Sequence, residues 1–187
     1  MDVLEAIRNR RSVRSFKPAN LPEELLHEIL EAGTWAPSHR NTQPWDFVRV
    51  GPQARAKLLK MFQAKIDEIL ATQEVSEPAK KGMLSLKEDF GGAPCLLAVT
   101  SRPPEQEVDR FEFPLSAAMA IQNMWLAAWS KGVGMIWLTV GSAPPARGIL
   151  EIPEGHTGIA LLALGYPKMV SPPPPRNPVR DRLRQVP

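Results

Sequence analysis

The chain has 187 residues, of which 43% are hydrophobic and 23% are charged, and its net charge is +3. This length fits one domain with a substantial core, and the composition is that of an ordinary globular protein. So small a positive excess does not indicate nucleic-acid binding, and no apolar run is long enough to cross a membrane. The first residues lack the pattern of a signal peptide, so we expect a soluble cytoplasmic protein.

The first half of the chain reads mainly as helices. Residues 2–9 predict a short helix with Asp2 as its N-cap. A second helix is expected from residue 22 to residue 33, and a longer amphipathic helix from residue 53 to residue 71. A strand is expected at residues 46–50. Residues 72–92 are polar and compatible with helix, which predicts a peripheral excursion from the core.

The second half alternates strands with one long helix. Residues 93–99, 135–139 and 157–164 are apolar runs that predict strands. Residues 102–113 read as a charged loop. Residues 114–131 predict a helix that is apolar on almost every side, and such a helix must be covered all round. We therefore expect it at a subunit interface, within an α+β fold whose sheet is covered by helices.

The chain shows no internal linker, so we expect one domain over residues 1–187. Pro172 to Pro175 form a run that favours extended polyproline, and residues 171–187 are predicted to form a C-terminal arm. The single cysteine, Cys95, reads as a small buried residue of a strand. Since no second cysteine exists and the three histidines lack ligand spacing, we expect no metal site.

Two segments concentrate the polar chemistry. Arg10 to Phe16 holds three arginines and two serines directly after a helix, which indicates an anion cradle. Arginine binds phosphate through paired, charge-assisted hydrogen bonds. If the segment is extended, Arg14 points the same way as Ser12. A second polar segment, Ala36 to Trp45, leads into a strand. Together they suggest a site in which the first segment clamps a phosphate group and the second contacts a ring of the same ligand. The alternative for the first segment is a solvated basic run beside the C-terminus of a helix.

Six motifs in order carry a resemblance to a known family: RRSVRSF, APSHRNTQPW, GAPCLLAV, GVGMIWLT, ALGYP and RNPVRDRL. In these motifs the chain resembles the nitroreductase family of flavin-dependent oxidoreductases. The resemblance implies a nitroreductase-like α+β fold, with a central, mostly antiparallel sheet flanked by helices, in an intertwined homodimer. It also implies FMN as the cofactor, with NAD(P)H and a small-molecule electron acceptor as partners, and neither nucleic acid nor a membrane.

The resemblance also assigns cofactor-binding residues. The phosphate is expected at Arg10, Arg11 and Ser12, with Arg14 at the pyrimidine edge of the flavin. A loop that reaches the flavin of the other subunit would supply Ser38, His39 and Asn41, with Trp35 as a wall. Backbone N–H groups of Trp137, Leu138 and Thr139 are expected behind the ring. A late Arg-x-Pro element places Arg176 over the phosphate, while the family's lysine position is occupied by Pro174.

The function implied is an FMN-dependent oxidoreductase. NAD(P)H would pass electrons through flavin N5 to an oxidised organic acceptor such as a nitroaromatic or a quinone, in ping-pong order. No catalytic side chain is required, because the flavin carries the electron chemistry. The family often has Pro-x-Glu-Gly where this chain has Trp137 to Val140. That departure keeps an alternative open, a low-turnover flavin-binding module for storing, sensing or delivering FMN.

Overall fold

A computed structural model describes residues 1–186; Pro187, the last residue of the predicted arm, lies outside the described residues. The centre is a four-stranded sheet in the order β1-β2-β4-β3, with every neighbouring pair antiparallel. The strands are β1 (Trp45–Arg49), β2 (Cys95–Ser101), β3 (Gly134–Leu138) and β4 (Thr157–Gly165). The predicted α+β class with an antiparallel sheet is confirmed.

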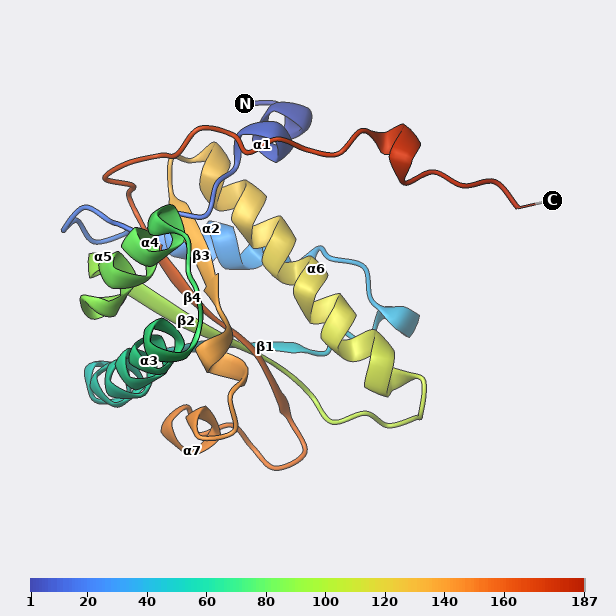
Figure 1. The fold of residues 1–187 in the computed structure, drawn as a ribbon. Helices are drawn as coiled ribbons and strands as arrows, with labels where there is room; N and C mark the ends of the chain where they lie inside the picture. The colour runs from blue at the N-terminus through green and yellow to red at the C-terminus, as the bar shows by residue number, and fades with distance from the viewer. Residues whose placement is uncertain (187) are drawn as a thin grey trace.

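Helices cover both faces of this sheet (Figure 1). They are α1 (Val3–Asn9), α2 (Glu23–Thr34), α3 (Pro52–Thr72), α4 (Glu77–Lys87), α5 (Asp89–Gly92), α6 (Asp109–Ser130) and α7 (Ala146–Ile149). Helices α2 and α6 pack on one face, while α3, α4, α5 and α7 lie on the other. Among residues 1–186 no helix has the length and apolarity needed to span a membrane.

The two central strands are buried on both sides. Along β2, Cys95, Leu97 and Val99 face the core under α2 and α6, whereas Leu96 and Ala98 face the core under α3 and α4. Strand β4 alternates in the same way. Since successive side chains point to opposite faces, a strand with a core on each side becomes a continuous apolar run. This explains why β2 and β4 were recognisable in the sequence by hydrophobicity alone.

Local signals place most helix ends where they were predicted. The Asp2 side chain accepts hydrogen bonds from the N–H groups of Leu4 and Glu5 at 2.8 and 3.0 Å, so it caps α1. These two bonds also lower the pKa of the Asp2 carboxyl. Helix α3 begins with Pro52, one residue from the predicted start, because proline suits a first helical turn. The predicted excursion contains α4 and the short α5.

Several predicted boundaries are wrong. Strands β1 and β2 were expected at residues 46–50 and 93–99, and each is displaced by one or two residues from those bounds. Helix α6 begins at Asp109, so residues 109–113 are helical and Pro114 lies inside the helix. Phe113 is buried and the Asp109 carboxylate accepts the N–H groups of Glu105 and Gln106, which fixes the earlier start. Strand β3 ends at Leu138 and Thr139 opens a 3-10 turn instead.

The turn after β3 is set by close contact between chain segments. A Cβ atom on Gly141 would lie 2.2 Å from the backbone nitrogen of Leu161, so only glycine allows the turn to rest against β4. The C-terminal arm then passes α1 and leaves the body of the molecule (Figure 1). Residues 171–186 are exposed, with one short 3-10 turn at Val179–Asp181.

Candidate functional site

The segment after α1 is extended and lies against the edge of the sheet. Ser12 forms a parallel bridge with Met135 of β3, and the N–H of Val13 donates to the Met135 carbonyl at 3.1 Å. Val13 and Phe16 are buried in the core, so they hold the segment in place. Because side chains alternate along an extended chain, Ser12 and Arg14 lie on the same side and line the same cavities.

A cationic cavity of about 380 Å³ lies over this segment. It is called the arginine cavity below, and it is lined by Arg10, Arg11, Ser12, Arg14, Ser171, Pro172, Pro174 and Arg176. The structure therefore brings five of the predicted cofactor-binding residues together from two ends of the chain. None of the lining residues is acidic, so nothing in the lining neutralises four guanidinium groups. The Pro172–Pro175 run carries Arg176 to the cavity.

Two guanidinium groups of the cavity have buried donors without a partner. Within residues 1–186, neither Arg10 Nη1 nor Arg11 Nε finds an acceptor. Arg11 also donates through Nη1 to the carbonyls of Arg8 and Arg10, so part of this side chain caps the end of α1. Burial lowers the pKa of Arg10, and the nearby charges of Arg11 and Arg176 lower it further. A bound phosphate would accept the free donors and relieve the repulsion, so the residues fit that group.

A second cavity of about 370 Å³ continues from the first, since Ser12, Arg14 and Ser171 line both. Its wall on the α4 side is Pro78, Lys81, Gly82 and Ser85. A Cβ on Gly82 would lie 2.7 Å from Arg14 Cδ, so the glycine lets Arg14 lie against the helix. Ser85 donates its hydroxyl to the Arg14 carbonyl at 2.9 Å. Helix α4 thus fixes both the backbone and the side chain of Arg14.

The predicted ring-contacting loop forms a 3-10 turn at His39–Asn41. Arg40, Asn41 and Gln43 have φ values of 54°, 54° and 46°, which are uncommon for residues other than glycine. The Ser38 hydroxyl accepts the Gln43 N–H at 3.0 Å. Trp35, His39 and Asn41 are exposed, and Trp35 is 81% exposed. Strain held in an exposed turn is typical of functional loops.

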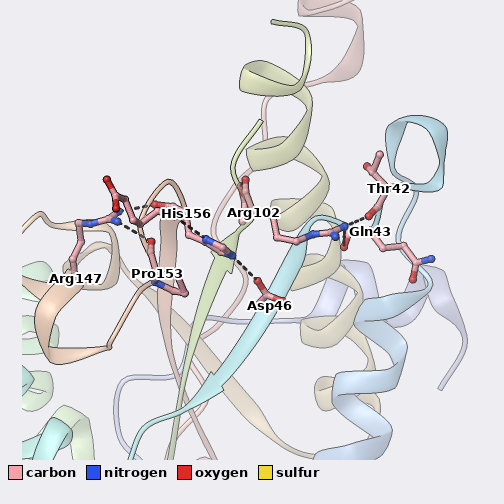
Figure 2. Close-up of polar contacts among 9 residues, drawn as sticks. Thr42, Gln43, Asp46, Arg102, Arg147, Pro153 and His156 are labelled. Atoms are coloured by element: carbon pink, nitrogen blue, oxygen red, sulfur yellow. Dashed lines mark hydrogen bonds and ion pairs between the residues drawn. The ribbon is translucent and has the colours of Figure 1, made fainter. Parts of the chain in front are cut away.

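Arginines anchor this turn to the body of the protein. Arg40 donates to the buried Asp109 carboxylate at 2.9 Å. Arg102 donates to the carbonyls of Thr42 and Gln43, as Figure 2 shows. The same view shows Asp46, on β1, paired with His156, and the distance between Asp46 Oδ2 and His156 Nε2 is 3.4 Å. These anchors could not be predicted from the sequence, because they join residues 59 or more positions apart.

The exposed turn and the arginine cavity lie at opposite ends of α6. The turn is tied to Asp109 at the start of the helix, while the Arg10 guanidinium lies over Trp125 near its end. Sixteen residues of helix separate these contacts, or about 24 Å at 1.5 Å per residue. Neither Ser38, His39 nor Asn41 lines the arginine cavity. One protomer therefore does not bring the two predicted groups together.

The third predicted group lies at the end of β3. Trp137 is partly buried and packs on the core under α6, while Leu138 is buried in the opposite core. Thr139 lines an apolar cavity of about 470 Å³ together with Val140 and residues of α3. Among residues 1–186, no group of three or more His, Cys, Asp or Glu side chains is placed to hold a metal ion.

The chain is similar to proteins of one family. A sequence model described as "Nitroreductase family" matches residues 7–166. YfhC of Bacillus subtilis, named as a candidate NAD(P)H nitroreductase, is 28% identical over 97% of this chain and 93% of its own. The 5,6-dimethylbenzimidazole synthase of Rhodospirillum rubrum is 30% identical, over 88% of this chain and 82% of its own.

A solved structure agrees with these sequence matches. A nitroreductase of Desulfitobacterium hafniense, solved with bound FMN, superposes with a TM-score of 0.71 at 27% identity. The match covers 100% of this chain and 99% of that one. The fold and the sequence agree over most of the chain, and the protein belongs to the nitroreductase family.

Proposed function

We propose that this protein is an FMN-dependent oxidoreductase that uses NAD(P)H to reduce a small oxidised organic acceptor, such as a nitroaromatic or a quinone. The observation that carries the proposal is the arginine cavity, with its buried unpaired donors and no acidic residue. Such a cavity fits the phosphate of FMN. The flavin, when bound, supplies the electron transfer, so the protein has to bind, orient and shield it.

The chain's own residues divide this work. Arg10, Arg11, Ser12 and Arg176 would hold the phosphate from two directions. Arg14, fixed by α4, would bring positive charge to the pyrimidine edge, where it favours the reduced cofactor. Backbone N–H groups at Trp137, Leu138 and Thr139 would approach the ring, with Thr139 contributing from a turn rather than from the predicted strand.

The proposal includes a homodimer. Val108, Phe111, Leu115 and Met119 are 44%, 69%, 43% and 38% exposed and recur at helical spacing, and they are called the α6 stripe below. An exposed apolar row of this kind marks an interaction surface. A partner subunit on the stripe would also explain how the His39–Asn41 turn reaches a flavin, which it does not do within one protomer.

The first test is the visible spectrum of the purified protein, recorded without oxygen before and after NADH or NADPH is added. A flavin spectrum that bleaches within seconds supports the proposal, and a screen of nitroaromatic and quinone acceptors follows. Bound flavin that neither nucleotide reduces supports the low-turnover binding module instead. Protein that neither carries nor takes up FMN refutes both.

Two variants test the assigned phosphate site. Arg10→Ala removes a charged donor and Ser12→Ala removes a hydroxyl, so each should weaken FMN binding, Arg10→Ala by roughly 10- to 100-fold. Lys60→Ala serves as the control, because Lys60 lies on the exposed surface of α3. Unchanged affinity in both variants would remove these residues from the site.

A further inference from the structure

The indole ring of Trp125, on α6, packs against an arginine of the arginine cavity. The Arg10 guanidinium carbon lies 4.4 Å from the centre of the Trp125 ring. Trp125 is itself only 9% exposed and belongs to the core beneath α2 and α6. Trp125 is not among the residues that line the cavity. It therefore touches Arg10 and leaves the space for a ligand free.

This contact opposes two effects that would otherwise displace Arg10. The Arg11 and Arg176 charges repel its guanidinium, and the long arginine side chain has many rotamers to lose when it is held in one place. The face of an indole ring attracts a cation, more strongly than a phenyl ring does and most strongly where water is excluded. Stacking also leaves the edge of the guanidinium, with its N–H groups, free to donate.

We propose that Trp125 is a positioning residue for phosphate recognition, which holds the Arg10 guanidinium ready to bind the phosphate of FMN. This inference rests on the proposed function, since it takes FMN as the ligand of the arginine cavity. It assigns Trp125 a role that depends entirely on Arg10. The role is specific for the phosphate, so the rest of the flavin should bind equally well without it.

Riboflavin separates this role from a purely structural one, because it has the same ring system and lacks the phosphate. The quantity to measure is the ratio of the dissociation constants of riboflavin and FMN, by fluorescence titration of the apoprotein. Trp125→Leu should lower this ratio by roughly tenfold, and Trp125→Phe, which keeps a weaker ring, by about threefold. A general loosening of the core would weaken both ligands alike and leave the ratio unchanged.

Two further variants complete the test. Trp129→Leu removes a tryptophan one turn along α6 that packs on the opposite core, and it should leave the ratio unchanged. In an Arg10→Gln background, Trp125→Leu should change the ratio by less than about twofold, because the residue through which it acts is gone. Thermal unfolding of each apoprotein shows whether it is folded, and Trp125→Phe carries the test if Trp125→Leu does not fold.

The outcomes are distinct. If wild-type protein binds FMN no better than riboflavin, or binds neither, the proposed function fails. If wild type prefers FMN strongly and both Trp125 variants keep that preference, the inference fails while the proposed function stands. A loss of preference in Trp125→Leu that persists in the Arg10→Gln background would also overturn it, since Trp125 would then act by another route.

Discussion

Replacing Phe111 with alanine should weaken the proposed dimer by about two orders of magnitude without unfolding the protomer. Phe111 lies within the α6 stripe and is 69% exposed, the largest exposed fraction among the four residues of the stripe. Its ring has few contacts within its own chain. The substitution therefore removes apolar surface that only a partner subunit would cover.

The magnitude follows from the exposed fraction. Burying a whole phenylalanine side chain contributes about 1.5–3 kcal/mol, so the exposed part of Phe111 accounts for roughly 1–2 kcal/mol. In a two-fold symmetric interface the same residue occurs on both subunits, which gives about 2–4 kcal/mol per dimer. Since 1.4 kcal/mol is a tenfold change, the dissociation constant should rise by roughly 30- to 700-fold.

Sedimentation equilibrium over a range of concentrations measures this constant directly. Leu84→Ala is the matched control, because Leu84 is 44% exposed but lies on α4 and away from the stripe. Circular dichroism and thermal unfolding verify that the variant protomer stays folded. A Phe111→Ala protein with the dimer constant of the wild type would show that the α6 stripe is not the interface. FMN affinity should fall with the dimer, since the His39–Asn41 turn would then lose its position.

Three smaller changes test other parts of the structure. Gly91→Ala should lower the free energy of unfolding by about 2 kcal/mol or more, measured in urea, because Gly91 has φ +72° and a Cβ there would lie 2.3 Å from the Arg14 carbonyl oxygen. Arg40→Ala should lower it by about 1–3 kcal/mol and increase proteolysis near residue 40, because the buried Asp109 carboxylate loses its positively charged partner. The difference in free energy of unfolding between wild type and Cys95→Ala should decrease as the pH rises from about 7 to 10.

The sign of the last prediction follows from burial. Desolvation raises the pKa of the Cys95 thiol, so the folded protein resists ionisation that the unfolded chain undergoes near its ordinary thiol pKa. The contribution of Cys95 to stability is therefore complete below that pH and is lost as the pH rises further. A difference that stays constant over this pH range would contradict the burial of the thiol.

Gly132→Ala is the control for Gly91→Ala, since Gly132 has a similar φ and no atom lies within 4 Å of a Cβ placed there.

Much of the fold could be predicted because its signals are local. Asp2 is the N-cap of α1, and α3 begins at Pro52, one residue from its predicted start. The continuous apolar runs of β2 and β4 follow from a core on each face of the sheet. The predicted start of α6 was wrong because the charges of residues 102–113 signalled a loop. Burial of Phe113 and the contacts of Asp109 outweigh that signal, and they depend on residues elsewhere in the chain.

The candidate site, like the fold, was predicted from the sequence only in part. The residue types predicted the chemistry of the site, since a run of arginines and serines after a short helix favours an anion as the ligand. The folded arrangement set which groups meet, because contacts between distant segments depend on how the elements pack. It brought Arg176 to Arg10 and put Trp125 beneath the guanidinium. It also separated the His39–Asn41 turn from the cavity by most of the length of α6, a distance that a residue pattern does not encode.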